Sequence, residues 1–351
     1  MIRISSIFPK RASHYNLKKI IMKKQDLSKE EINAILDQFT DWFSHPDVVG
    51  IDLGADESGE IQLEVDQLEE SESIEAADLA TDPVDFTLPE FVEITLQSQS
   101  LSSPSTHGSL PERIPVKVNR VSEDIEDELI DGSDELSALT LADPVMAASL
   151  TRIRPAPGGY FIRTEGMKGR GSLGVSINYR GHYRILSNNH VIAKNGNIGK
   201  WVYQPDRVRP DNQLARVSGY DPIQYYKRKK QRSPVYNVHD VAWCDSDAQI
   251  SKQAVREIGP VAGWREPVMN EEIWFFGART QTLRSAKIVS LTRRYRSKGS
   301  LGYSWWKDGI KLDRSISQSG DSGTAYVAQS DQMVVALHRS GSKSYSTGCP
   351  L

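Results

Sequence analysis

Apolar residues recur at helical spacing early in the chain and in short strand-like runs after that. Ser28 and Glu31 form a capping-box pair ahead of apolar residues at positions 32, 35, 36, 39 and 43. This pattern predicts an amphipathic helix over residues 28–45. Strands are expected at 48–54, 61–65, 91–96 and 114–121. One helix with about four strands predicts a small α+β domain over residues 26–121.

From Tyr160 onward the pattern changes to short alternating runs separated by turns that contain Gly, Asn and Asp. Examples are residues 160–163, 172–177, 273–276 and 324–327. Such spacing is typical of antiparallel barrels, so residues 155–351 are expected to form a mainly β domain. Residues 122–154 are expected to be an acidic linker, and residues 1–25 a flexible basic tail.

Charge divides the chain, although the formal net charge of the whole is only −3. Residues 1–150 carry 11 basic and 31 acidic side chains, whereas residues 151–351 carry 32 and 15. The two halves should therefore attract each other. The basic runs at 227–232 and 293–298 favour solvated loops, and the alternative is that one half docks on the other.

Three segments carry the residue types of nucleophilic catalysis. Ser-Gly-Asp-Ser-Gly spans residues 319–323, His190 follows an apolar run, and Asp240 precedes the run Val-Ala-Trp at 241–243. A serine hydroxyl attacks at neutral pH only when a base takes its proton, and a carboxylate fixes the tautomer of that base. We assign these roles to Ser322, His190 and Asp240, with Asp245 and Asp247 as rivals for the carboxylate.

The order His, Asp, Ser and the surrounding motifs resemble those of trypsin-like serine peptidases, over roughly residues 155–345. The match is best to bacterial members of intracellular type that carry Ser-Asn-Asn-His-Val, here residues 187–191. The resemblance implies a chymotrypsin-like double β-barrel with the triad between its barrels. It also implies an oxyanion hole made by the backbone N–H groups of Gly320 and Ser322.

The same resemblance implies a specificity pocket near the nucleophile, which we place at five residues: Ile316, Ser319, His338, Arg339 and Ser340. Ile316 stands six residues before Ser322, where trypsin keeps an acid, so a preference for basic substrates is not supported. His338 resembles the pocket histidine of glutamate-specific members. The alternative is that His338 packs and hydrogen-bonds at a strand edge.

Composition narrows the remaining classes. No apolar run reaches 18 residues and the first residues do not resemble a secretory signal, so neither a membrane span nor secretion is expected. The chain has two cysteines, Cys244 and Cys349, which favours a reducing compartment and a cytoplasmic protein. We expect no metal or organic cofactor, because acyl transfer through a triad needs neither.

The leading hypothesis is an intracellular serine endopeptidase that acts on protein or peptide substrates and is restrained by its acidic N-terminal region or by a regulatory partner. One alternative is a peptidase-fold interaction module without turnover. Another is a nucleic-acid binder that would use the basic runs and stack bases on Tyr225, Tyr226, Trp305 and Trp306. Neither alternative explains an intact triad, so nucleic acid is not the expected partner.

Overall fold

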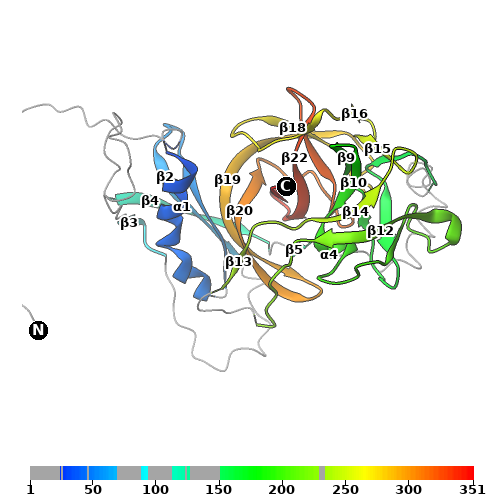
Figure 1. Cartoon of the computed structure of the whole chain (residues 1–351). Coiled ribbons are helices and arrows are strands. Elements are labelled where there is room, and N and C mark those ends of the chain that lie inside the picture. Colours follow the sequence, from blue (N-terminus) through cyan, green and yellow to red (C-terminus); the bar gives the residue numbers. More distant parts are fainter. Residues whose placement is uncertain are drawn as a thin grey trace, which may run out of the picture.

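The computed structural model describes residues 24, 27–45, 47–68, 88–93, 113–122, 125–126, 151–228 and 234–351. The expected tail, residues 1–25, falls almost wholly outside the described residues, and so does most of the expected linker. The described part is mainly β, and two β bodies lie side by side with the N-terminal elements beyond one of them (Figure 1). The predicted fold class, a double β-barrel preceded by a small α+β unit, is confirmed.

The first body is built on a sheet that begins after residue 160. Its strand order is β8 (Gly171–Ser172), β7 (Phe161–Thr164), β11 (Trp201–Tyr203), β12 (Gln213–Tyr220), β14 (Ala242–Ser246), β10 (His182–Ser187) and β9 (Val175–Tyr179). A smaller sheet holds β16 (Gly259–Pro260), β15 (Ser251–Val255) and β6 (Ala156–Gly158). Two short helices, α4 (Asn189–Ile192) and η3 (Pro210–Asn212), interrupt the strands.

The second body continues into the N-terminal elements through one large sheet. Its main path runs β13 (Tyr236–Asn237), β20 (Gly302–Leu312), β23 (Ser346–Cys349), β22 (Met333–Gly341), β21 (Ala325–Ala328), β18 (Glu272–Phe275), β19 (Arg284–Gly299), β1 (Val48–Ala55), β2 (Ile61–Leu68), β4 (Arg113–Val121) and β3 (Phe91–Glu93). Off this path, β17 (Gly263–Trp264) pairs with β22, and β5 (Ile125–Glu126) pairs with β19 and β22.

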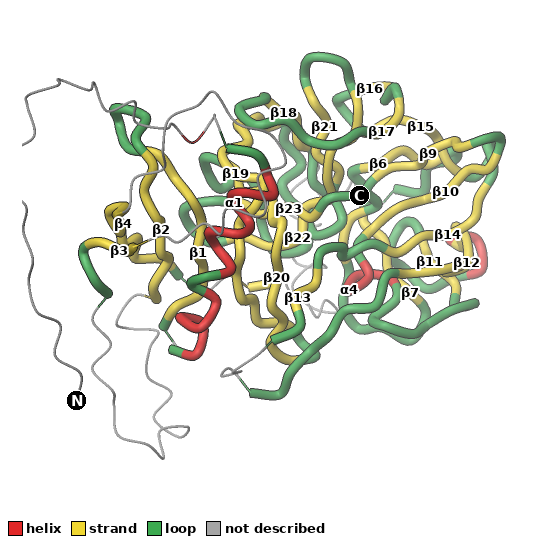
Figure 2. The backbone as a smooth tube through the Cα atoms, turned by 60° about the vertical axis from the view of Figure 1, so that its left-hand side comes forward, coloured by secondary structure: helices red, strands yellow, loops and turns green. Residues whose placement is uncertain are grey.

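The N-terminal helix lies across the strands of its own unit and against the second body (Figure 2). The predicted capping box is present, with Ser28 and Glu31 each accepting the other's backbone N–H. The expected single helix over 28–45 is instead α1 (Lys29–Asp37) followed by a 3-10 turn, η2 (Thr40–Ser44). The α-helix ends where the backbone at Phe39 leaves helical dihedrals.

The N-terminal unit shares both a sheet and a core with the second body. Strand β1 pairs antiparallel with β19, opposite Tyr295 and Arg294. The apolar face of α1 packs in one cluster with β1, β2 and the buried Trp305 of β20. Because strand pairing and core are both continuous, the second body depends on the N-terminal unit for the cover of β19.

The structure corrects the expectation of a solvated loop at residues 293–298. This segment lies inside β19, and Arg293, Arg294 and Arg296 are at most 2% exposed. Acidic residues of the N-terminal unit compensate two of these charges, through pairs from Arg293 to Asp66 and from Arg294 to Asp37. The basic run is therefore part of the seam between the two halves of the chain. Of the run at 227–232, residues 229–232 lie outside the described residues.

Candidate active site

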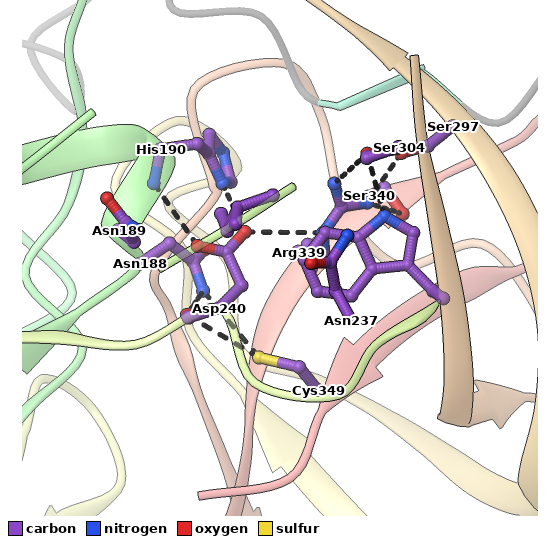
Figure 3. A network of polar contacts seen from close by, with 12 residues as sticks. Asn188, Asn189, His190, Asn237, Asp240, Ser297, Ser304, Arg339, Ser340 and Cys349 are labelled. Carbon is purple, nitrogen blue, oxygen red and sulfur yellow. Dashed lines mark hydrogen bonds and ion pairs between the residues drawn. The ribbon is translucent and has the colours of Figure 1, made fainter. Parts of the chain in front are cut away.

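His190 lies on the single helical turn α4, directly after β10. Asn188 precedes the helix in an extended conformation, and its side-chain amide donates to the backbone carbonyl of Asp240 at 2.7 Å. This bond links the start of α4 to the loop before β14. The local sequence therefore brings an imidazole and a carboxylate from two neighbouring strand ends to one place (Figure 3).

The carboxylate of Asp240 holds His190 through both of its oxygens. Oδ2 lies 2.5 Å from Nδ1 of His190, and Oδ1 accepts the backbone N–H of the same residue at 3.1 Å. Asp240 is fully buried. Burial acts to raise the pKa of Asp240, but the charge and hydrogen bonds of His190 and the charge of Arg339 hold it below its ordinary value. An ionised Asp240 favours the tautomer of His190 that carries its proton on Nδ1.

A second cation meets the same carboxylate. Nε of Arg339 lies 3.2 Å from Oδ2 of Asp240, and both side chains are fully buried. The sequence placed Arg339 in the substrate pocket, whereas its guanidinium points at the carboxylate from the side opposite His190 (Figure 3). Successive side chains of a strand point to opposite faces, so the alternation of β22 could have separated Arg339 from its neighbours, but the sequence prediction assigned all three to one pocket.

Ser322 lies in a tight loop before β21, and buried hydrogen bonds fix that loop. The carboxylate of Asp321 accepts the backbone N–H groups of Gln318, Arg279 and Thr280 at 2.9, 2.7 and 3.1 Å. Gly320 has a φ of +101°, which glycine adopts without the strain of a Cβ. The loop is therefore shaped before any ligand arrives.

The hydroxyl of Ser322 donates to the backbone carbonyl of Arg339 at 3.0 Å. Nε2 of His190 is buried and has no hydrogen-bond partner among the described residues. His190 therefore contacts Asp240 directly. Ser322 is linked to Asp240 through Arg339, whose backbone carbonyl accepts from the Ser322 hydroxyl and whose guanidinium lies against the Asp240 carboxylate.

The other four residues assigned to the pocket have different surroundings. Ile316 is buried in the apolar core of the second body, and Ser319 is exposed. Nδ1 of His338 lies 2.8 Å from the Tyr326 hydroxyl, and its ring is fully buried. Ser340 is buried on β22, with its hydroxyl 3.4 Å from a guanidinium nitrogen of Arg339.

The two tryptophans that the nucleic-acid hypothesis would use for base stacking lie in the protein interior. Trp305 and Trp306 are at most 1% exposed. Trp306 packs against the guanidinium of Arg339, 3.7 Å from its ring centroid, and Tyr226 packs edge-on against Trp305. These rings are not available to a nucleic acid, so the stacking surface that the binder hypothesis needs is missing at both positions.

The two cysteines are free and buried. Burial raises the pKa of the Cys349 thiol to about 12, and it raises that of Cys244 further. A raised pKa disfavours the reactive thiolate, so neither side chain has the features of a nucleophile. Within the ranges given above, no cluster of His, Cys, Asp and Glu is able to hold a metal ion. The same residues include no helix long and apolar enough to cross a membrane.

No protein-family model and no curated protein matches this chain. Solved structures do match at low identity. One is described as a glutamic acid specific serine protease that uses a histidine triad in substrate binding, at 15% identity and a TM-score of 0.38, covering 56% of this chain and 93% of that one. Protease A of Thermobifida fusca matches at 16% and 0.39, covering 55% and 90%.

A third match is a homologue of alpha-lytic protease, at 14% identity and a TM-score of 0.39, which covers 56% of this chain and 92% of the other. These neighbours are chymotrypsin-like serine proteases. At identities of this size the likeness concerns the fold alone. The assignment of chemistry therefore rests on the side chains of the site.

Proposed function

We propose that this chain is a serine endopeptidase with Ser322 as nucleophile, His190 as general base and Asp240 as the carboxylate that orients the base. The observation that carries this proposal is that the Asp240 carboxylate contacts His190 twice, at Nδ1 and at the backbone N–H. These contacts leave Nε2 as the ring nitrogen that is proposed to receive a proton. It supports the order of roles that the sequence predicts.

The proposed reaction transfers the hydroxyl proton of Ser322 to Nε2 of His190 while Oγ bonds to the substrate carbonyl carbon. Collapse of the tetrahedral intermediate breaks the C–N bond, and the imidazolium gives its proton to the leaving amine. Water then hydrolyses the acyl-enzyme by the same proton route. The backbone N–H groups of Gly320 and Ser322 are proposed to stabilise the oxyanion, a contribution of about 3 kcal/mol per donor.

Active-site labelling tests the proposal. A fluorophosphonate probe is expected to label Ser322, and Ser322→Ala abolishes labelling and peptide hydrolysis. Ser176→Ala is the matched control, because Ser176 is a buried serine bonded to Ser251 away from the site. Labelling that persists in Ser322→Ala would sink the assignment. A folded protein that never labels would favour the interaction-module alternative.

A strand from the expected linker supports regulation by the chain itself. On one edge of β22, Ala325 pairs with Leu337, and the Ser322 hydroxyl meets the Arg339 carbonyl further along. Immediately beyond, the backbone of β5 pairs antiparallel with Ser340 and Gly341. The chain's own strand therefore covers the edge beside the nucleophile.

Extended peptides bind proteins by adding a strand to such an edge. We therefore propose that substrate peptides use the edge at Ser340 and Gly341, and that β5 competes with them from within the chain. An intramolecular competitor acts at an effective concentration of about millimolar. This restraint suits the proposed location in a reducing, cytoplasmic compartment, where uncontrolled proteolysis is harmful.

Ile125→Pro tests this restraint. Proline removes the backbone donor of a strand that lies between β19 and β22, so β5 should leave the edge. Labelling and hydrolysis are expected to increase about tenfold. Ile125→Val keeps the donor and serves as the control. Equal rates in both variants would remove β5 as the restraint while leaving the triad assignment intact.

Preference for an acidic residue at the cleavage site stays a prediction. It depends on His338, whose Nδ1 is engaged by the Tyr326 hydroxyl. Peptides that differ only at the residue before the scissile bond would measure it. Faster cleavage after Glu than after Gln, lost in His338→Leu, is the expected result, and a clear preference for Arg or Lys contradicts it.

A further inference from the structure

The strongest unexplained feature of the site is a fully buried arginine on the carboxylate of Asp240. Arg339 approaches Oδ2, which is also the oxygen that contacts Nδ1 of His190. One carboxylate oxygen thus lies between an imidazole and a guanidinium. An arginine keeps its charge throughout the physiological pH range, whereas the imidazole changes charge within it.

The guanidinium is held on several sides. Its Nη1 donates to the Ser297 hydroxyl at 2.9 Å, and Nη2 donates to the Ser304 hydroxyl at 3.3 Å. These serines face each other across the β19–β20 hairpin. The ring of Trp306 lies against the guanidinium at 3.7 Å. The hairpin therefore fixes the cation and leaves it aimed at Asp240 (Figure 3).

We propose that Arg339 is a positioning residue that keeps Asp240 oriented and ionised and that shares the negative charge of Asp240 with His190. The inference deepens the proposed function, since it concerns the same base. Its physical reason is charge sharing. With Arg339 present, an imidazolium at His190 adds a second positive charge beside a carboxylate that is already neutralised, so Asp240 stabilises that imidazolium less than it would alone.

Other groups near the carboxylate do not replace this effect. Cys349 lies 3.6 Å from the backbone carbonyl of Asp240, and its thiol is neutral because burial raises its pKa to about 12. The Asn188 amide on the same carbonyl is uncharged. His239 is the adjacent residue in the chain, and Nδ1 of its ring lies 3.3 Å from the carbonyl of Pro350. Arg339 is the charged side chain that the structure places on Oδ2 together with His190.

The test follows the imidazole directly, so that it does not depend on turnover. In full-length Ser322→Ala protein carrying ¹⁵N-labelled histidine, the His190 signals are assigned by their loss in His190→Gln. Adding Arg339→Gln is expected to raise the midpoint of the His190 titration, because Asp240 then compensates the imidazolium alone. Arg339→Lys keeps a charge and should return most of the shift. A midpoint that does not move in Arg339→Gln overturns the proposal.

Arg293→Met is the matched control, because Arg293 is equally buried and pairs with a carboxylate outside the site. It should leave the His190 midpoint unchanged; an equal shift there would mean that loss of any buried arginine causes the effect. Should Arg339→Gln fail to fold, Ser297→Ala removes one hydrogen bond of the guanidinium and is expected to raise the midpoint by less than Arg339→Gln would. No shift in that variant overturns the proposal too.

In active protein, the acid limb of the pH profile of kcat/KM should move to higher pH together with the NMR midpoint. A limb that stays in place while the NMR midpoint moves would count against His190 as the base, and not against the role of Arg339. Absence of hydrolysis with the expected NMR shift would likewise reject the proposed function alone.

Discussion

Two buried arginines of the large sheet each pair with a buried aspartate, and the two pairs have different surroundings. Arg339 meets Asp240 within the candidate active site, and Arg293 meets Asp66 at the seam with the N-terminal unit, at 2.9 Å. All four side chains are almost wholly buried. In each pair neighbouring cations hold the pKa of the carboxylate below its ordinary value against the opposing effect of burial.

The difference lies in the third group on each carboxylate. Asp240 shares its oxygen with His190, an imidazole whose other ring nitrogen has no hydrogen-bond partner among the described residues. Asp66 accepts from the Asn119 amide and lies 3.9 Å from Lys311, and neither of these side chains is an imidazole. Under the proposed function the first pair therefore acts on the base, whereas the second contributes to stability. The same chemistry serves function or assembly according to what else touches it.

Asparagine at each aspartate should separate the two roles most strongly. Asp240→Asn is expected to lower kcat by on the order of 10⁴-fold, because the amide favours the wrong tautomer of His190. Asp66→Asn should leave kcat of the folded protein within about threefold, because it lies outside the site. Peptide hydrolysis by Ile125→Pro protein carrying each change would measure both. Equal losses would mean that the two pairs are not separate.

The free energy of unfolding, in contrast to kcat, should fall strongly when Asp66 is changed. Asp66→Asn leaves Arg293 buried without its charge partner, which commonly costs about 3 kcal/mol or more. Lys117→Met is a control, since Lys117 is half exposed and its pair with Glu64 should contribute less than about 1 kcal/mol. Urea unfolding followed by tryptophan fluorescence would report both. A cost below 1 kcal/mol for Asp66→Asn would contradict a structural role for the seam.

Lowering the pH should reduce the contribution of the Arg293–Asp66 pair to the stability of the protein. The pKa of Asp66 is lowered in the folded state, so its contribution is fully present above the unfolded value near 4 and is lost as pH falls through the lower folded value. Wild-type stability should therefore decline below about pH 4 more steeply than that of Asp66→Asn. Unfolding curves between pH 3 and pH 6 would show the difference, and parallel declines would contradict it.

Local patterns predicted much of this arrangement. The capping box at Ser28, the strands flanking His190 and Asp240, and the glycine-rich loop at Ser322 each carry their signal within a few residues. Such signals reflect short-range hydrogen bonding and alternation, which a single sequence displays. The order of the three segments then gave the candidate triad.

Long-range pairing is what the sequence did not reveal. The basic run in β19 has the composition of an exposed loop, yet its charges are buried because acids more than 200 residues away compensate them, as Asp66 does for Arg293. Arg339 was assigned by its neighbours in β22, whereas its partners come from β19, β20 and the loop before β14. Composition cannot show which charge meets which, and the seam and the Asp240 pair both depend on that.

Asp52 extends the comparison, because it is a buried carboxylate that pairs with no arginine among the described residues. Its Oδ1 accepts the Leu53 N–H and the Ser290 hydroxyl, each at 2.9 Å. Burial raises the pKa of Asp52, although Lys24, Lys311 and the Ser290 bond act against it. A raised folded pKa means that stability is lost as pH rises through it.

Asp52→Asn keeps an oxygen acceptor for both bonds and removes the charge. It should stabilise the protein at pH 7, and the gain should be smaller near pH 4, because a raised pKa lets the wild-type carboxyl take up its proton more readily in the folded state. Urea unfolding at the two pH values would measure this, with Asp56→Asn in an exposed turn as the control. Destabilisation at pH 7 would show that the lysines compensate Asp52 as fully as arginine compensates Asp66.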